Sequence, residues 1–267
     1  MYETIHYTCV QHIARLTFNR PEKMNSFTEQ MHSEVRQAIA QALADQARVL
    51  LITAHGRGFC AGQDLSDRAV SNEQHVENAG PKDLSQTIGK NWNPLIASLR
   101  ALNIPVVAAV NGVAAGAGAS VALAADIVIA AESASFLQAF VNIGLMPDSG
   151  SSHFLQKHLG SARAMALCLL GEKLSAQEAA AWGLIWKCVP DAELMDQADK
   201  IASKLAHSAP LATAAIKKAI QLAETSTLSE QLEHERITQG QLGFSQDYQE
   251  GVSAFMHKRK ANFRGNK

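Results

Sequence analysis

Residues 106–126 constrain the fold more than any other stretch of this chain. A β-branched run ends in an Asn-Gly turn at Asn111, and very small residues of helical composition follow it. This order predicts a buried strand, a tight turn and a helix whose first turn carries almost no side chains. A ligand or another backbone can approach such a helix start closely. The free N–H groups there can donate to a negatively charged oxygen.

A second stretch repeats this design. Residues 49–54 form a short apolar run that predicts a strand, and residues 55–64 after it are rich in glycine. In open α/β folds, ligands bind at the carboxyl ends of strands, which is where this loop is expected. Two glycine-rich loops, each with exposed amides and without nearby side-chain acids, indicate an oxyanion hole.

The order of the remaining segments predicts an α/β core followed by a helical appendage. Residues 4–10 and 12–19 alternate as strands, and residues 26–29 read as a capping box for a helix that runs to about Asp45. We therefore expect an α/β core over residues 1–195 and a helical oligomerisation region over residues 196–267. The helices expected in the later part cover residues 192–207, 211–223, 228–239 and 245–258.

Three local features refine this outline. Residues 65–83 are polar and aperiodic and predict a surface excursion without regular structure. The helix expected over residues 84–102 should bend near Asn93, because Pro94 lacks a backbone N–H. Residues 175–178 form a second capping box ahead of a helix that Gly183 ends.

Composition excludes several classes of function. The formal net charge of the 267 residues is −1, which leaves no basic surface for nucleic acid and no polybasic segment for a membrane. We expect no secretion signal and no membrane-spanning segment, because no suitable apolar run is present. The four scattered cysteines predict reduced thiols in a cytoplasmic protein. The ten histidines show no metal-ligand spacing, so we expect no metal.

Two familiar chemistries fit the residues poorly. Gly116 and Gly118 suggest a dinucleotide loop, but Ser120 and Val121 stand where the third glycine belongs. Ser149 and Ser151 lie near His153 in sequence, but no Gly-x-Ser-x-Gly elbow is present to expose a nucleophile. Neither nucleotide binding nor serine hydrolysis is therefore the preferred interpretation.

An oxyanion hole with a single carboxylate fits better. The amides of Gln63 and Ala117 would stabilise the enolate of an ester or thioester. Asp148 follows the apolar residues 143–147, which would desolvate its carboxylate and raise its pKa toward the range of a general base. An equally good interpretation makes Asp148 a cap of the helix that follows it. The pattern leaves both open.

At these same residues the chain resembles the crotonase (enoyl-CoA hydratase/isomerase) superfamily. The resemblance covers essentially the whole chain. It implies a crotonase-like spiral of ββα units with a C-terminal helical trimerisation region, acyl-CoA substrates, and a homotrimer or a hexamer built from two trimers. The segments that carry it are residues 18–25, 58–65, 105–131 and 250–255.

The resemblance also assigns roles to individual residues. The oxyanion donors fall on Gln63 and Ala117, where Ala117 replaces the glycine usual in the family. Coenzyme A belongs to the substrate, and no further cofactor is implied. The resemblance implies that the following further positions contact the CoA thioester: Lys23, Met24, Ala61, Gly62, Asp64, Leu65, Gly116, Phe140, Lys258 and Phe263. In relatives, the positions of Lys258 and Phe263 often reach it across a subunit boundary.

The acid and base positions depart from the hydratases of the family. Hydratases carry two glutamates, and here those positions hold Ser120 and Phe140, neither of which transfers protons at neutral pH. Asp148 falls where isomerases of the family have their aspartate. Dehalogenases place an aspartate there too, but they need a histidine where this chain has Asn93 and a tryptophan at Phe140.

Within the family, three runs look like the branch that isomerises ring-epoxidised phenylacetyl-CoA to oxepin-CoA and moves Δ3 double bonds to Δ2: residues 59–68, 114–119 and 180–186. The resemblance thus implies a cofactor-independent isomerase with Asp148 as its acid and base. Phe136, Phe140 and Trp92 would line an apolar pocket for a ring. The alternatives are a hydratase, a dehalogenase-like enzyme, and a non-catalytic acyl-CoA-binding subunit.

Overall fold

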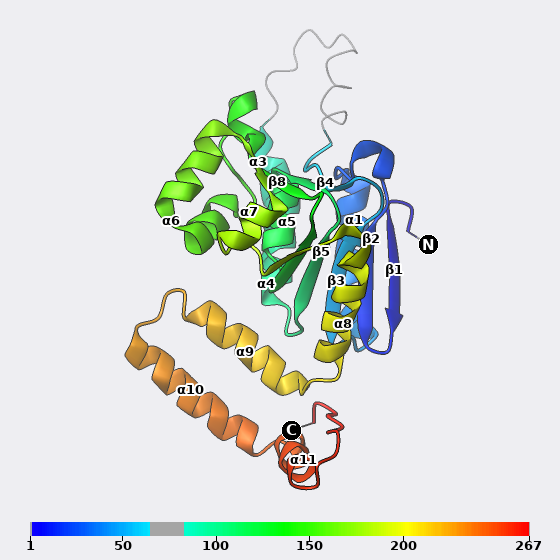
Figure 1. The fold of residues 1–267 in the computed structure, drawn as a ribbon, viewed down its shortest axis with the longest axis vertical. Helices are drawn as coiled ribbons and strands as arrows, with labels where there is room; N and C mark the ends of the chain where they lie inside the picture. The colour runs from blue at the N-terminus through cyan, green and yellow to red at the C-terminus, as the bar shows by residue number, and fades with distance from the viewer. Residues whose placement is uncertain (1, 65–82, 267) are drawn as a thin grey trace.

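The computed structural model describes residues 2–64 and 83–266 of the chain. The surface excursion expected over residues 65–83 lies outside the described residues apart from Asp83, and so does Leu65. The chain runs from an α/β body to a set of helices at one end (Figure 1).

The described strands form two sheets, and most neighbouring strands are parallel. Antiparallel pairing occurs between β1 and β2 and between β8 and β9. The larger sheet consists, in spatial order, of β1 (Ile5–Val10), β2 (Ile13–Phe18), β3 (Val49–Ala54), β5 (Val106–Val110), β7 (Ile127–Ala131) and β10 (Lys187–Val189). The smaller sheet consists of β4 (Gly58–Cys60), β6 (Val113–Ala115), β8 (Ser135–Leu137) and β9 (Lys173–Ser175).

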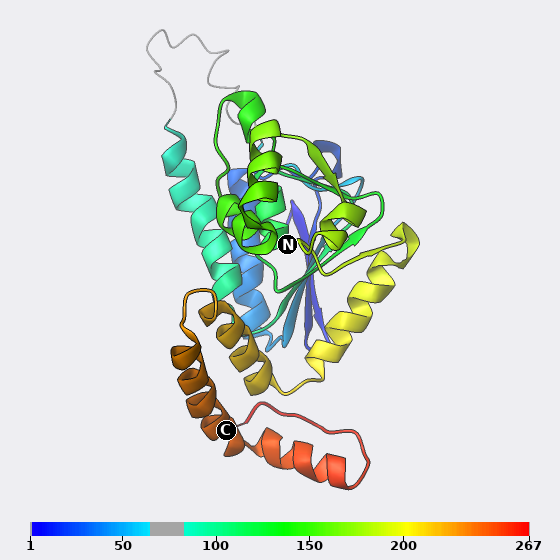
Figure 2. The same ribbon diagram turned by 60° about the vertical axis from the view of Figure 1, so that its left-hand side comes forward.

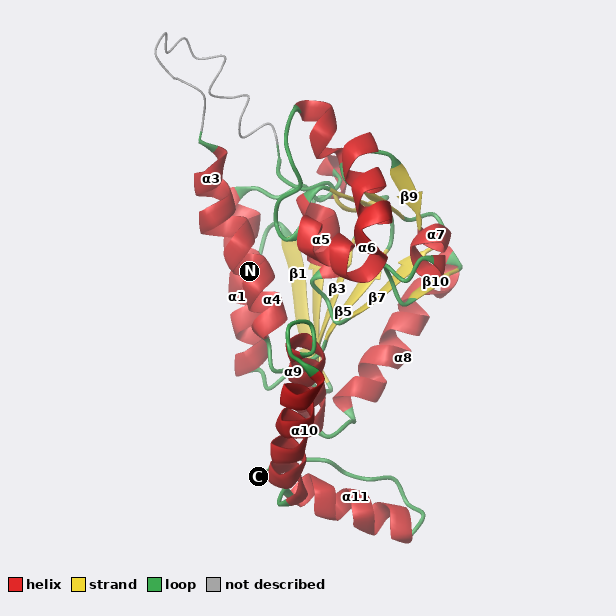
Figure 3. Ribbon diagram, turned by 90° about the vertical axis from the view of Figure 1, so that its left-hand side faces the viewer, coloured by secondary structure: helices red, strands yellow, loops and turns green. Residues whose placement is uncertain are grey.

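The middle of the larger sheet is covered on both faces. Every residue of β3 and β5 is buried, as expected for parallel strands between layers of helices. Helices α1 (Glu29–Ala44) and α4 (Asn93–Ala101) lie on one side of the sheet, and α8 (Leu194–Ala206) lies on the other (Figure 3). Helix α8 begins at the boundary expected near residue 195 and still packs on β3 and β5.

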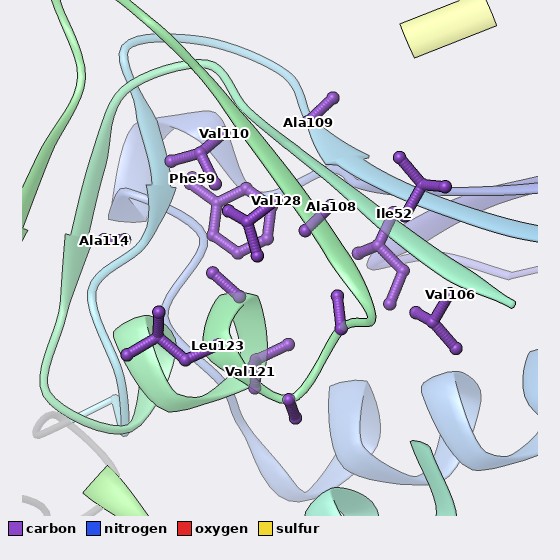
Figure 4. Packing of buried hydrophobic residues seen from close by; sticks show 14 of the residues in the cluster. Ile52, Phe59, Val106, Ala108, Ala109, Val110, Ala114, Val121, Leu123 and Val128 are labelled. Carbon is purple, nitrogen blue, oxygen red and sulfur yellow. The ribbon is translucent and has the colours of Figure 1, made fainter. Parts of the chain in front are cut away.

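Residues 106–126 form the predicted strand, turn and helix, with a short additional strand inserted. Strand β5 leads through Gly112 into β6 and then into α5 (Ala117–Leu123), all of whose residues are buried. A Cβ at Gly112 would lie 2.1 Å from the Arg57 carbonyl oxygen, so only glycine fits. Figure 4 shows Phe59 and Val128 packed with Val121 and Leu123 of α5. Small residues therefore let this helix sink into the core.

The helix expected over residues 84–102 is interrupted where the sequence predicts a bend. It consists of α3 (Leu84–Thr87), a π-helical turn η2 (Ile88–Trp92) and α4, with Pro94 in the first turn of α4. Helix α6 (Ser151–Leu170) similarly contains a break at Gly160, whose φ is +71°.

One of the two capping boxes is wrong. Helix α1 is capped by Thr28, whose side chain accepts a hydrogen bond from the Met31 amide, and not by Ser26. The physical reason is that Phe27 pairs in a parallel bridge with Gln63 and so stays extended. The second box is confirmed, because Ser175 and Glu178 cap the start of α7 (Ala176–Ala181) reciprocally.

The last helices extend from one end of the body, as both Figure 1 and Figure 2 show. They are α9 (Pro210–Leu222), α10 (Leu228–Gly243) and α11 (Gln246–Met256). The buried Lys217 of α9 anchors them, because its ammonium group lies 2.8 Å from the Asp126 carboxylate at the start of β7. None of the helices described in the structure is long and apolar enough to cross a membrane. The remaining single turns are η1 (Pro21–Lys23), η3 (Ala139–Ile143) and η4 (Asp191–Glu193).

Candidate active site

The two predicted oxyanion loops meet in space. A Cβ at Gly62, whose φ is +86°, would lie 3.2 Å from the Ala115 carbonyl oxygen and 3.5 Å from the Ala117 nitrogen. A Cβ at Gly118 would lie 2.2 Å from the Cys60 carbonyl oxygen, a distance that no side chain tolerates. The glycines are therefore required because β4 and the start of α5 touch backbone to backbone.

Two backbone N–H groups at this contact have no acceptor among the described residues. Within residues 2–64 and 83–266, no hydrogen bond to another residue uses the amide of Gln63 or the amide of Ala117. The neighbouring amides are satisfied, since that of Asp64 donates to Phe27 and that of Gly62 contacts the Cys60 sulfur. Ala117 is buried and Gln63 is half-buried, and amides in such positions are usually paired, so these two open donors indicate a position for an external oxygen.

A cavity of about 250 Å³ opens beside these amides. It brings together Gln63, Ala117, Phe140 and Asp148, although up to 85 residues of chain separate them. The described residues that line it are Ala61, Gly62, Gln63, Thr87, Ile88, Trp92, Ala115, Gly116, Ala117, Ala139, Phe140, Ile143, Leu145 and Asp148.

Asp148 is not a helix cap. Helix α6 begins after Gly150 in the left-handed conformation, and no side chain caps it. The Asp148 carboxylate instead accepts a hydrogen bond of 2.9 Å from the hydroxyl of Ser149. Ser149 is buried and has a φ of +53°, which places its hydroxyl beside the preceding side chain. The capping interpretation is therefore excluded, and Asp148 lies on the cavity.

The two positions at which the resemblance places the glutamates of hydratases hold a buried serine and a phenylalanine. Ser120 is fully buried, and its hydroxyl pairs with that of Ser151 at 2.5 Å. Phe140 packs against Gly116, because a Cβ at that glycine would lie 3.4 Å from the Phe140 ring. His153 contacts Glu224 on the surface, so it forms no catalytic pair with Ser151.

Four other predicted positions do not line the cavity. Met24 accepts a hydrogen bond from the Ala61 amide through its carbonyl, and Lys23 is exposed beside it. Asp64 is buried and forms a 2.9 Å ion pair with Arg20. Phe136, expected in the pocket, is buried in the core through β8.

Lys258 and Phe263 lie away from the cavity within one chain. Lys258 follows α11, which is at the opposite end of the molecule from β4, β8 and α5 (Figure 1). Phe263 packs beside Gly251, and its carbonyl accepts a hydrogen bond from Arg48.

The sequence interpretation missed several residues of the cavity wall. Thr87 and Ile88 reach it from the irregular helix before α4. Ile143 reaches it from the end of η3, and Leu145 from the loop that follows. The apolar loop of residues 143–147 was the available signal for the latter pair. Nothing in the local pattern distinguishes Thr87 and Ile88 from surface helix residues.

Burial controls the chemistry of the groups behind the loops. It raises the pKa of the Cys60 thiol to about 12, so this cysteine is no nucleophile at neutral pH. It lowers the pKa of His32 to about 4, which keeps that imidazole neutral. Among the described residues, no group of three His, Cys, Asp or Glu side chains is placed to hold a metal ion.

Comparison with known proteins identifies the family of the chain. The sequence profile of the enoyl-CoA hydratase/isomerase family matches residues 8–266. The chain belongs to this family. The crotonase-like fold expected from the sequence is thereby confirmed, with parallel sheets and C-terminal helices as in the solved structures of the family.

Individual relatives of the chain include isomerases and hydratases. The chain is 49% identical over 255 residues to the 1,2-epoxyphenylacetyl-CoA isomerase of Escherichia coli, with 95% of each chain covered. It is 34% identical to the 2,3-dehydroadipyl-CoA hydratase of the same organism, with 96% of each covered. The crystal structure of an enoyl-CoA hydratase from Bacillus anthracis matches with a TM-score of 0.90 and 31% identity, covering 99% of this chain and all of that one.

Proposed function

We infer that this member of the enoyl-CoA hydratase/isomerase family is an isomerase of CoA thioesters that needs no further cofactor. The observation that carries this proposal is the cavity wall. Asp148 is the only ionisable side chain among the described residues that line it. One carboxyl group can remove a proton and return it elsewhere, whereas hydration also needs a group that activates water.

In the proposed mechanism, the thioester oxygen accepts hydrogen bonds from the amides of Gln63 and Ala117. The Asp148 carboxylate removes a proton from the carbon next to the thioester carbonyl, and the electron pair moves into a dienolate. The protonated Asp148 then returns the same proton to the far carbon, which turns a 3-enoyl thioester into a 2-enoyl thioester. Each amide donor is worth about 3 kcal/mol of barrier in such sites.

For the acyl group, we propose 2-(1,2-epoxy-1,2-dihydrophenyl)acetyl-CoA, with conversion to oxepin-CoA, alongside straight-chain 3-enoyl groups. The isomerase from Escherichia coli named above supports the ring substrate through its 49% identity. The wall supports it too, because Trp92, Phe140 and Ile143 offer an apolar surface to a ring.

The test is product identification with a panel of 3-enoyl-CoA, dienoyl-CoA and epoxyphenylacetyl-CoA. We expect conjugated 2-enoyl-CoA from the first and oxepin-CoA from the last. Loss of the crotonyl-CoA chromophore at a comparable rate would instead identify a hydratase, which the 2,3-dehydroadipyl-CoA hydratase relative favours. Binding of every thioester without conversion would identify a non-catalytic acyl-CoA-binding subunit.

We further propose that the chain assembles as a homotrimer, alone or as half of a hexamer. The helices α9 to α11 expose large apolar side chains, and Phe244 and Phe255 are 86% and 83% exposed. Apolar patches of this kind mark contact surfaces. In such an assembly, Lys258 and Phe263 would approach the CoA of a neighbouring subunit, and Lys23, Met24 and Ala61 that of their own. Light scattering of the wild type and of Phe255→Glu tests the assembly.

A further inference from the structure

The side chain of Gln63 is held at both ends of its carboxamide. The indole N–H of Trp92 donates to Gln63 Oε1 at 2.9 Å, and Gln63 Nε2 donates to the Phe27 carbonyl oxygen at 2.9 Å. An indole nitrogen can only donate, so it must face the oxygen of the carboxamide. This requirement fixes the orientation of the Gln63 side chain.

Phe27 also holds the backbone on either side of Gln63. Its amide donates to the Gly62 carbonyl at 2.8 Å, and its carbonyl accepts from the Asp64 amide at 2.9 Å. These bonds fix the loop to Phe27, in addition to the hydrogen bond from the Ala61 amide to Met24 and the ion pair between Asp64 and Arg20. The bond from Trp92 comes from a different element, the π-helical turn η2, and therefore restrains the loop in a second direction.

Trp92 is itself held rigidly. It is 2% exposed and packs against Phe27 and His32, with ring centroids 5.0 Å and 4.5 Å away. His32 Nε2 lies 3.5 Å from Gln63 Oε1, which leaves room for a weak second donor to the same oxygen. A group that cannot move is suited to positioning another group to within a fraction of an ångström.

We propose that the indole N–H of Trp92 is a positioning group for the oxyanion hole. Acting through the Gln63 carboxamide, it aims the Gln63 backbone N–H at the thioester oxygen. The inference rests on the proposed function, because it takes that amide as an oxyanion donor. Trp92 then has two roles: its ring lines the apolar pocket, and its indole N–H controls the polarisation of the substrate through Gln63.

The first test is Trp92→Phe, which keeps an aromatic ring in the core and removes the N–H together with the five-membered ring of the indole. We expect kcat to fall about tenfold with KM changed by less than about twofold, because the donor matters more as charge develops on the oxygen. Trp182→Phe is the matched control. Its ring packs under Arg163 away from the cavity, and both constants should stay at wild-type values.

A spectroscopic readout separates positioning from packing. Hydrogen bonds to the thioester oxygen shift the absorption of bound cinnamoyl-CoA to longer wavelength by polarising the carbonyl. We expect this shift in the wild type and Trp182→Phe and a smaller one in Trp92→Phe. A full shift with unchanged kcat in Trp92→Phe would overturn this inference alone. No shift in the wild type would overturn the oxyanion hole itself, and the proposed function with it.

The route through Gln63 is tested by a double-mutant cycle. Gln63→Met removes the carboxamide and keeps the backbone amide, so it should lower kcat about as much as Trp92→Phe. If Trp92 acts through this side chain, the double variant should lose no more than the more severe single variant. Losses that multiply in the double variant would show that the two residues act independently and would overturn the proposal.

Discussion

The two walls of the cavity are built on different principles. The wall with Gln63 and Ala117 presents backbone groups, and its shape follows from strand β4 touching the start of α5 at Gly118. The opposite wall presents side chains, Phe140 and Asp148, on the segments after β8. Backbone contacts permit few substitutions, whereas side chains that point into open space can be exchanged. In the proposed function, the first wall fixes which functional group is polarised, and the second selects the reaction.

The largest effect is expected from Asp148→Asn, which tests the role proposed for the second wall. The amide keeps the shape of the side chain but cannot take up a proton, so we expect kcat for 3-enoyl-CoA isomerisation to fall by about a thousandfold or more. Affinity for the CoA thioester should stay within a few-fold of wild type by calorimetry, because the backbone wall is untouched. Turnover near the wild-type rate would mean that the second wall does not select the reaction.

The next largest effect is expected from Gly118→Ala. The added methyl would lie 2.2 Å from the Cys60 carbonyl oxygen, so β4 and α5 must move apart and the two oxyanion amides with them. We expect kcat to fall about a hundredfold, together with a loss of about 2 kcal/mol or more in unfolding free energy from overpacking. Gly240→Ala is the control, because this exposed glycine of α10 has nothing within 4 Å of a Cβ. Equal melting temperatures for the two variants would contradict the close contact of the loops.

Ser149→Ala tests how the second wall holds its carboxylate. The variant removes the hydroxyl that donates to Asp148 Oδ1 at 2.9 Å. Hydrogen bonds to charged groups contribute about 1.5 kcal/mol or more, so we expect kcat to fall about tenfold with KM nearly unchanged. Ser151→Ala is the comparison, because its hydroxyl pairs with Ser120 and not with the base. If both variants lose the same activity, the orientation of Asp148 does not depend on Ser149.

The sequence predicts those parts of the two walls whose structure is determined by neighbouring residues, and it fails where a residue distant in sequence determines the structure. The strand, turn and helix of residues 106–126 could be predicted because short-range composition determines them. The start of α1 was misplaced at Ser26 because Phe27 is held extended by Gln63, a partner distant in sequence. Phe136 and Phe140 look alike in sequence, but the short strand β8 turns the first into the core and η3 places the second on the cavity.

The contact between Trp92 and Gln63 is likewise beyond prediction from local sequence. Each residue has an ordinary local pattern, and 29 positions separate them. Their hydrogen bond arises only when the π-helical turn η2 lies against the loop after β4. The glycine-rich loops and the resemblance to a family predict the backbone donors, but neither predicts the side-chain contact between Trp92 and Gln63.

His32, which packs behind the wall with Gln63, should make the unfolding free energy depend on pH. His32 is neutral in the folded chain, since burial lowers its pKa from 6.5 to about 4. Between these values the unfolded chain binds a proton that the folded chain does not, so unfolding free energy falls as pH falls from 6.5 to 4. In His32→Phe, which keeps a ring beside Phe27 and Trp92, this dependence should be weaker. Urea midpoints at pH 7, 5.5 and 4.5 measure it, and parallel curves for the two proteins would contradict the buried neutral imidazole.

The smallest effect is expected from Ser120→Ala, and it sharpens the comparison most. Ser120 belongs to the helix of the backbone wall but occupies a position where hydratases carry an acid or base. Its buried hydroxyl pairs with Ser151, donates a long hydrogen bond of 3.5 Å to the Asp148 backbone carbonyl and does not line the cavity. Its loss should therefore change kcat by less than about threefold while lowering stability by about 1 kcal/mol. Ser120→Glu with crotonyl-CoA provides the converse test. A collapse of isomerase activity in Ser120→Ala would assign the proton transfer to this helix. It would contradict the proposal that the wall with Asp148 transfers the proton.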